Sequence, residues 1–290
     1  MNVPIAVIAA VGGWISLPTS RGRAGRGFDL PGAAIAAGGM VALVYASTTN
    51  MALLAVSAVL LAMFVLREAR TPNPLLPLRI FAERNRAGAY ITVALAIAGM
   101  FGAFLFLTYY LQVVLRFTPL QAGLAFLPMT VASQAGSWLI ASRLMPHVPP
   151  RALMAPGAVV AAAGMALLTQ LHVDSNYLTL VLPAEVLLGL GISCVMVPAF
   201  STATQRIDPR EAGVASAIVN TASQIGGSLG TALLNTIAIS ATAGFAGPRA
   251  AALVHGFSVA TGWGTAILLV GALAAALLIT APSPSSSRSR

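Results

Sequence analysis

The sequence predicts an all-α, polytopic membrane protein with about nine transmembrane helices. Hydrophobic residues make up 58% of the 290 positions and charged residues only 8%, whereas soluble domains average about 25% charged residues. Long apolar runs recur along the whole chain, and a helix needs roughly 20 mainly apolar residues to cross the hydrocarbon layer. Short connections join these runs, so consecutive helices are expected to be antiparallel neighbours.

Nine apolar segments are the predicted spans. The first lacks the basic start and the cleavage site of a signal peptide, so it is read as a membrane span. The connection over residues 67–86 contains prolines that exclude one continuous helix. In chain order the predicted spans are roughly Asn2–Leu17, Pro31–Ser47, Met51–Leu66, Ala87–Leu115, Gln121–Leu144, Ala152–Leu171, Tyr177–Thr204, Ala212–Ser240 and Phe257–Ala281.

These spans predict a simple organisation along the chain. Residues 1–18 form a single transmembrane helix, 31–67 a two-helix hairpin, 68–86 a cytoplasmic loop, 87–281 a six-helix bundle and 282–290 a disordered cytoplasmic tail. The tail reads PSPSSSRSR and is low in complexity. The hairpin has almost no polar residues, which fits a peripheral position facing lipid.

The arginines predict the orientation. The net charge is +9, from sixteen basic residues, all of them arginine. Fourteen fall in alternate connections and the tail, and only Arg116 and Arg249 lie on the other side. Since cytoplasmic loops are rich in arginine, the C-terminus is predicted to be cytoplasmic, in a plasma (inner) membrane, and the N-terminus outside. Such scattered charge does not predict nucleic-acid binding.

The predicted span 212–240 contains no charge but carries many polar side chains. On a helix they fall within a sector of about 120°, and Ile218, Ile225, Leu229 and Leu233 occupy the opposite face. Either this polar stripe lines a water-filled cavity, with Asn220 and Gln224 as the main candidates, or it makes ordinary interhelical hydrogen bonds. Gly226 and Gly230 form a GxxxG pair that permits close helix packing. The stripe consists of Ser216, Asn220, Gln224, Ser228, Thr231 and Asn235.

Glu185 is the only ionisable residue well inside a predicted span. Burial in apolar surroundings favours the protonated acid, so Glu185 is a candidate for carrying a proton during transport. Alternatively it lies near the membrane surface and has no role in coupling.

A second set of candidates lies in the span 87–115. Phe101, Leu105, Thr108, Tyr109 and Gln112 fall near one face. Aromatic rings and an amide suit bulky lipophilic or cationic substrates, and Phe101, Tyr109 and Gln112 are therefore cavity candidates. The alternative for the tyrosines is packing or a place in the interfacial aromatic belt.

The sequence offers no catalytic set, so an enzyme is not predicted. It contains no nucleotide-binding loop, no metal-ligand spacing and no paired carboxylates in the spans, and its one cysteine, Cys194, lies in an apolar run. No cofactor or metal is therefore expected, and the proton gradient is the expected driving force if the protein is active.

Three stretches of the chain carry a family resemblance, and they read NVPIAVIAAVGG, LTYYLQVVLRFTPLQAGLAFLP and GVASAIVNTASQIGGSLGTAL. They resemble segments of the fourteen-helix drug/proton antiporters of the major facilitator superfamily. The first is similar to the start of that family's sixth helix. The second resembles the junction of its ninth and tenth helices, and the third resembles its thirteenth helix. The resemblance covers nearly the whole chain. Two positions depart from it, because Arg116 replaces a more usual Gly and Glu185 a more usual neutral residue.

The resemblance implies that the chain corresponds to helices six to fourteen, without the first five. Residues 1–18 would then be the remnant of an N-terminal bundle, and the hairpin would be the extra helix pair between two six-helix bundles. The implied function is proton-coupled efflux of drugs or other small molecules. Expected partners are the bilayer, a small lipophilic or cationic substrate, and either a missing N-terminal half or a second copy. The alternative is a membrane remnant or assembly partner that does not transport.

Overall fold

The structure, a computed structural model of the chain, describes residues 29–46, 52–71, 83–204 and 212–280 together with Val7 and Gly12. Every regular element in these ranges is a helix. The chain divides into two compact units, Met1–Pro77 and Leu78–Arg290. The predicted span Asn2–Leu17 and the predicted disordered tail lie outside the described ranges.

The first unit contains a helical hairpin of α2 (Leu30–Ala46) and α3 (Ala52–Arg70). Asp29 precedes α2 and accepts a hydrogen bond from the backbone N–H of Gly32, which caps the helix. The same carboxylate pairs with Arg67 in the last turn of α3, at 2.7 Å from its Nη2. One buried carboxylate therefore caps one helix and holds it to the other.

The middle of the hairpin is held by a close approach between its two helices. The Ser57 hydroxyl is buried and donates to the Gly39 carbonyl at 2.9 Å. A Cβ built on Gly39 would lie 2.9 Å from the Leu61 side chain, so glycine permits this contact. Apolar side chains such as Val56, Val59 and Met63 point outward, as expected for a hairpin surrounded by lipid.

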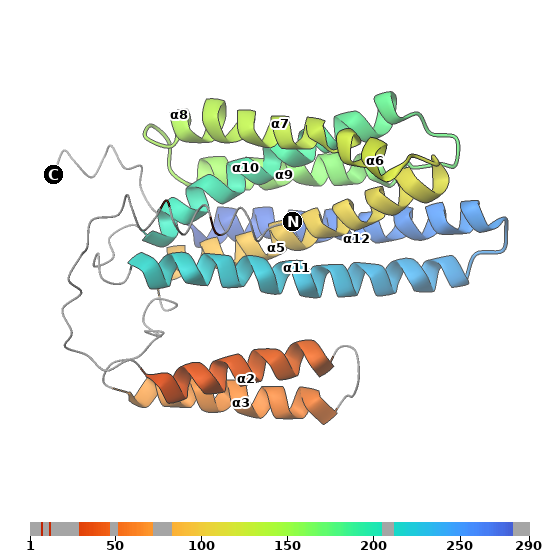
Figure 1. Ribbon diagram of the computed structural model, residues 1–290. Helices are drawn as coiled ribbons and strands as arrows, with labels where there is room; N and C mark the ends of the chain where they lie inside the picture. The colour runs from red at the N-terminus through yellow and green to blue at the C-terminus, as the bar shows by residue number, and fades with distance from the viewer. Residues whose placement is uncertain are drawn as a thin grey trace. The chain divides into compact units, whose positions relative to one another are not determined.

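The second unit is a bundle whose described part contains six helical segments long and apolar enough to cross a membrane. Figure 1 shows α5 running through the bundle between α11 and the layer formed by α7, α9 and α10. Its elements are α5 (Arg84–Tyr109), η1 (Tyr110–Val114), α6 (Pro119–Ala125), α7 (Leu127–Ala135), η2 (Gly136–Ala141), α8 (Ser142–Leu144), α9 (Arg151–Leu168), η3 (Tyr177–Val181), α10 (Leu182–Thr204), α11 (Ala212–Ala243) and α12 (Arg249–Leu278).

The six segments of the bundle coincide with six predicted spans, with one marked difference at a boundary. The last helix was expected to begin at Phe257 but begins at Arg249, directly after Pro248. Arg249 and His255 made this stretch look like a polar loop. Since Arg249 occupies the first helical position, its charge remains at the end of the helix, and His255 is exposed on the helix surface.

Small residues set the distances between helices in the bundle. A Cβ on Gly191 of α10 would overlap the backbone of Ala161 in α9, and one on Gly157 would lie 2.7 Å from the Cys194 side chain. Without a hydrophobic driving force between helices in lipid, close backbone contact is a main source of stability. The glycine and alanine content of the spans therefore reflects packing.

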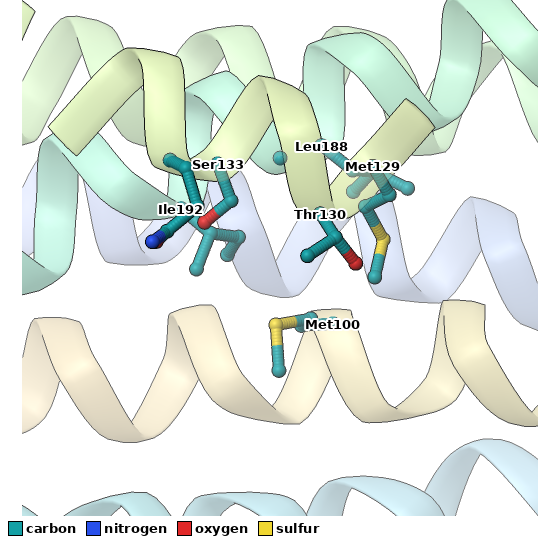
Figure 2. Close-up of a pocket in the computed structure, with 8 residues that line it drawn as sticks. Met100, Met129, Thr130, Ser133, Leu188 and Ile192 are labelled. Atoms are coloured by element: carbon teal, nitrogen blue, oxygen red, sulfur yellow. The ribbon is translucent and has the colours of Figure 1, made fainter. Parts of the chain in front are cut away.

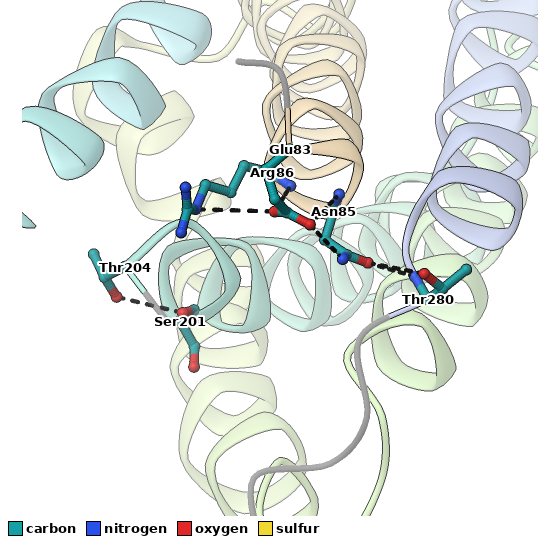
Figure 3. Close-up of polar contacts among 6 residues, drawn as sticks. All are labelled: Glu83, Asn85, Arg86, Ser201, Thr204 and Thr280. Atoms are coloured by element: carbon teal, nitrogen blue, oxygen red, sulfur yellow. Dashed lines mark hydrogen bonds and ion pairs between the residues drawn. The ribbon is translucent and has the colours of Figure 1, made fainter. Parts of the chain in front are cut away.

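The end of the bundle at which α5 begins, here called the Glu83 end, is closed by polar bonds (Figure 3). The Glu83 carboxylate caps α5 by accepting from the backbone N–H groups of Asn85 and Arg86. The Asn85 side-chain oxygen accepts from the Thr280 N–H at 2.6 Å, beyond the end of α12. Burial alone would raise the pKa of Glu83, but the hydrogen bonds to its carboxylate lower it.

At the opposite end, here called the Tyr177 end, α5 passes into the π-helical turn η1 and then reverses. Arg116 has a φ of 61°, in the left-handed region. Thr118 then starts α6 with a capping box, in which its hydroxyl accepts from the Gln121 N–H and the Gln121 side chain accepts from the Thr118 N–H. The reversal therefore depends on one strained residue followed by a strong helix start.

Candidate functional site

The polar stripe of α11 lies on an exposed side of the bundle. Asn220, Gln224, Ser228 and Asn235 are exposed, and Thr231 is half-buried. Gly226 and Gly230 lie on a different side of α11, where an added Cβ would overlap Ala94 and Ala98 of α5. The close contact with α5 at the two glycines thus leaves these side chains of the stripe exposed.

The side chains of the stripe differ in how they satisfy their hydrogen-bonding groups. Ser228 donates to the Ile225 carbonyl, and Asn220 donates to the Ser216 carbonyl at 3.2 Å. Gln224 and Asn235 make no side-chain hydrogen bond with any described residue. An amide left without a partner in hydrocarbon costs several kcal/mol. This side of α11 is therefore suited to water, a ligand or another polar surface, and not to lipid.

An apolar side of α11 is exposed on the face opposite the stripe. Leu229 is 60% exposed and Leu233 is 52% exposed, as expected for side chains that face lipid. Ile218 was expected to lie with them, but it is only 6% exposed and packs inside the bundle. The helix therefore presents three sides: a small-residue side to α5, a leucine side, and the stripe.

Figure 2 shows a cavity between α5, α7 and α10, with Met100 facing the side chains of the other two helices. Its volume is about 160 Å³. Two methionine side chains contribute flexible, polarisable surface, and a hydroxyl pair and an amide contribute hydrogen-bonding groups. The lining residues are Met100, Met129, Thr130, Ser133, Gln134, Leu188, Gly189 and Ile192.

Sequence reasoning did not identify this cavity. The signal was present, since Thr130, Ser133 and Gln134 have the i, i+3, i+4 spacing that places three polar side chains on one face of a helix. The segment was predicted only as a membrane span, because the polar run in α11 is longer and gives the stronger pattern. Met100 carries no such signal, because a methionine in an apolar span resembles any other packing residue.

The candidates from the predicted span 87–115 lie in two places: Phe101 lies within α5, and Tyr109 and Gln112 lie at the Tyr177 end. Phe101 is 44% exposed and its ring faces α11, where a Cβ on Gly227 would lie 3.5 Å from it. Tyr109 is exposed at the Tyr177 end, with its ring centroid 6.4 Å from that of Phe257. Gln112 is exposed but belongs to η1, whose wider turn takes it out of the regular α5 register.

Glu185 lies in the first turn of α10 and is completely buried. One carboxyl oxygen lies 3.3 Å from the Tyr177 hydroxyl, which also donates to the Ala125 carbonyl at 2.7 Å. The other oxygen has no hydrogen-bond partner among the described residues. Since an unpaired buried carboxylate is costly, this surrounding favours the neutral acid. Glu185 is thus enclosed at the Tyr177 end, separate from the exposed stripe.

Comparison with known proteins shows the family to which the chain belongs. A model of the Major Facilitator Superfamily matches residues 2–231. The chain is 46% identical to the puromycin resistance protein pur8 of Streptomyces alboniger, over 96% of this chain and 59% of the relative. It is 33% identical to the cephamycin export protein CmcT of Amycolatopsis lactamdurans, over 84% of this chain and 52% of that protein.

A third relative is the tetracenomycin C resistance and export protein of Streptomyces glaucescens, which is 31% identical over 82% of this chain and 46% of its own length. The chain therefore spans about half the length of the curated relatives it matches. The apolar helical bundle and these matches define a polytopic membrane protein. The chain belongs to the major facilitator superfamily, as its sequence motifs implied.

Proposed function

We propose that the protein takes part in efflux of small lipophilic or cationic molecules, with the α11 stripe facing the transport route. The single observation that carries this proposal is the exposure of the Gln224 and Asn235 amides without a partner among the described residues. Lipid cannot satisfy these groups, whereas a water-filled route can. Relatives named for puromycin resistance and cephamycin export support a drug-like substrate.

The cavity between α5, α7 and α10 is the proposed contact site for the substrate within this bundle. Methionine side chains adapt to ligands of different shape, while Thr130, Ser133 and Gln134 offer hydrogen bonds in an apolar wall. At about 160 Å³ the cavity is smaller than the roughly 300–1,000 Å³ typical of drug-sized ligands. It would therefore hold one part of a substrate while a facing surface holds the rest.

That facing surface is proposed to be a second helical bundle. Transporters of this kind bind substrate between two halves that move against each other, and an exposed amide stripe provides one wall of such a site. The second bundle would come either from a separate N-terminal half or from a second copy of the chain. The proposed setting is the plasma (inner) membrane, with the C-terminus on the cytoplasmic side as the arginine distribution predicts.

Proton coupling through Glu185 is part of the same proposal. Its burial and its unpartnered oxygen support a carboxyl group that is neutral in this conformation. Ionisation would require water or a new partner, and hence a rearrangement of α10 against α6 and η3. A group whose proton depends on conformation is what coupling to a proton gradient needs.

The proposal is tested by drug extrusion in a bacterial host that lacks its own pumps. The chain is expressed alone and together with the part of pur8 that the chain does not match, and puromycin resistance and ethidium extrusion are measured. We expect extrusion from co-expressed halves or from crosslinkable pairs of the chain. Extrusion by a monomeric chain would contradict pairing, and no extrusion in any arrangement would contradict transport.

A matched pair of variants tests the role of the stripe. Gln224→Leu removes a polar contact worth about 1 kcal/mol, which corresponds to a roughly fivefold loss of transport. Leu233→Ala changes the exposed leucine side of the same helix and should leave transport unchanged. Equal effects of the two substitutions would argue against a route along the stripe.

A further inference from the structure

A second, larger cavity lies between α5, α11 and α12 at the Tyr177 end. Its volume is about 470 Å³, within the range of about 300–1,000 Å³ found for sites of drug-sized ligands. Phe106 and Tyr109 come from α5, Asn235 and Thr242 from α11, and Leu253 and Phe257 from α12. Three helices thus enclose a space that the α5–α7–α10 cavity does not share.

Three aromatic rings form one wall of this cavity, here called the outer pocket. Phe106 and Phe257 are stacked, with ring centroids 5.5 Å apart, and both are buried. Tyr109 extends this wall, with its ring centroid 6.4 Å from that of Phe257. Because packing fixes Phe106 and Phe257, the Tyr109 ring lies against a rigid support, and at 52% exposure it is the aromatic surface that a ligand can contact with little ordering.

The polar groups of the outer pocket define the rest of its chemistry. The Thr242 hydroxyl already donates to the Ala238 carbonyl at 2.7 Å. The Asn235 amide makes no hydrogen bond with a described residue and remains available. None of the described lining residues carries a charge at neutral pH. An acyl chain would leave the amide unsatisfied, and a charged ligand would find no counter-ion, so an uncharged aromatic ligand with a polar group fits best.

The outer pocket lies beyond the middle of the stripe. Asn235 follows Gln224 by eleven residues, or about 16 Å along a helix with a rise of 1.5 Å per residue. Both amides belong to the same polar stripe of α11. A molecule that follows the stripe from Gln224 toward the Tyr177 end would therefore meet Asn235 and the aromatic wall next.

We propose that the outer pocket is a second binding site, which takes uncharged aromatic molecules carrying a hydrogen-bonding group such as a ketone. Asn235 provides the polar contact, and Tyr109, whose ring lies against the buried Phe257, provides the exposed aromatic surface. The geometry of the outer pocket supports ligand binding whether or not the protein transports the ligand. A role of this binding site during transport rests on the proposed function.

Benzophenone is a suitable probe because it is an uncharged diaryl ketone and also a photolabel. The full chain in lipid nanodiscs is irradiated with increasing concentrations of benzophenone, and labelled peptides are mapped by mass spectrometry. We expect saturable labelling of α11 near Ile239 and of α12 near Leu253. Ethidium, a cation, should not displace the label.

Two variants and two controls make the test specific. Leu253→Trp fills the pocket and should reduce labelling there at least tenfold, and Asn235→Leu should weaken it about fivefold by removing the hydrogen bond. Leu233→Trp adds the same bulk on the exposed leucine side of α11 and should have no effect. Gln224→Leu should impair transport but leave labelling intact, which separates this proposal from the transport proposal.

The labelling results either support the proposed binding site or overturn it. Saturable labelling that is lost in Leu253→Trp and weakened in Asn235→Leu supports the site, including when every transport assay is negative. Labelling that fails to saturate, that persists in Leu253→Trp, or that ethidium displaces overturns it. Because Asn235 is exposed, Asn235→Leu does not disturb packing, so weaker labelling in this variant cannot be attributed to misfolding.

Discussion

At the scale of single residues, hydrogen bonding separates side chains that look alike in the sequence. The hydroxyl groups of Ser228 and Thr236 in α11 donate hydrogen bonds to backbone carbonyls of the same helix. The amides of Gln224 and Asn235, in contrast, have no hydrogen-bond partner among the described residues. Composition and helical spacing placed all these residues correctly on α11. They could not show which of them satisfy their own hydrogen-bonding groups, because this depends on rotamers.

The sequence predicted that Glu185 lies inside a membrane span, but it did not predict which groups surround the carboxyl group. Replacing it with Gln keeps the size of the side chain and an oxygen for the Tyr177 hydroxyl, so the fold should be retained. If Glu185 carries the proton, Glu185→Gln should abolish the pH dependence of drug transport, whereas Tyr177→Phe should retain it. Transport by Glu185→Gln with the wild-type response to pH would remove Glu185 from the coupling mechanism.

Arg116 provides a test of backbone strain. Its φ of 61° places a residue with a Cβ in the left-handed region, which costs about 1–2 kcal/mol. Arg116→Gly should therefore stabilise the bundle by about 1 kcal/mol, seen as a higher unfolding temperature in detergent. An unchanged or lower unfolding temperature would mean that contacts of the arginine side chain outweigh the strain.

At the scale of helices, the apolar runs predicted six of the observed segments of the bundle, but their contacts depend on details that periodicity does not contain. The GxxxG pair of α11 predicted a close approach, and the structure identifies the partner as Ala94 and Ala98 of α5. The start of α12 was misplaced because Arg249 at a helix end looks the same in sequence as Arg249 in a loop. The cavity beside Met100 needed three helices to be positioned together.

The contact between α5 and α11 can be tested with a matched glycine control. Gly230→Leu introduces a side chain where a Cβ alone would overlap Ala98, so it should lower the unfolding free energy by roughly 1–3 kcal/mol or more. Gly123 in α6 has nothing within 4 Å of an added Cβ, so Gly123→Ala should be neutral or slightly stabilising. Equal unfolding temperatures of the two variants would show that α5 and α11 are not in close contact.

The hairpin offers a pH-dependent contact. Hydrogen bonds from Arg67 and from the Gly32 N–H lower the pKa of Asp29 below its usual value, which is about 3.9 in an unfolded chain. The contact therefore contributes fully above about pH 4 and is lost as the pH falls through the lower pKa of the folded state. Asp29→Asn should unfold at a lower temperature than wild type at pH 7, and the difference should shrink in strong acid. A difference that grows in acid would contradict this assignment.

At the scale of the whole molecule, the fold class and family followed from the sequence because lipid allows few ways to satisfy a backbone. Charge distribution and apolar length together specify a helical membrane protein, and three local motifs indicated the superfamily to which the chain belongs. The functional surface was only partly predictable. A stripe such as that of α11 becomes a candidate transport wall only when the bundle shows that neighbouring helices leave it exposed.

The most direct test of the central claim is the accessibility of α11 to water. In a Cys194→Ser background, single cysteines are placed at Asn220, Gln224 and Asn235 on the stripe and at Leu229 and Leu233 on the leucine side. They are then treated in native membranes with a charged, membrane-impermeant thiol reagent. The stripe cysteines are predicted to react and the leucine-side cysteines to remain unlabelled. Equal labelling of both sides, or labelling of the leucine side alone, would contradict a polar route along α11.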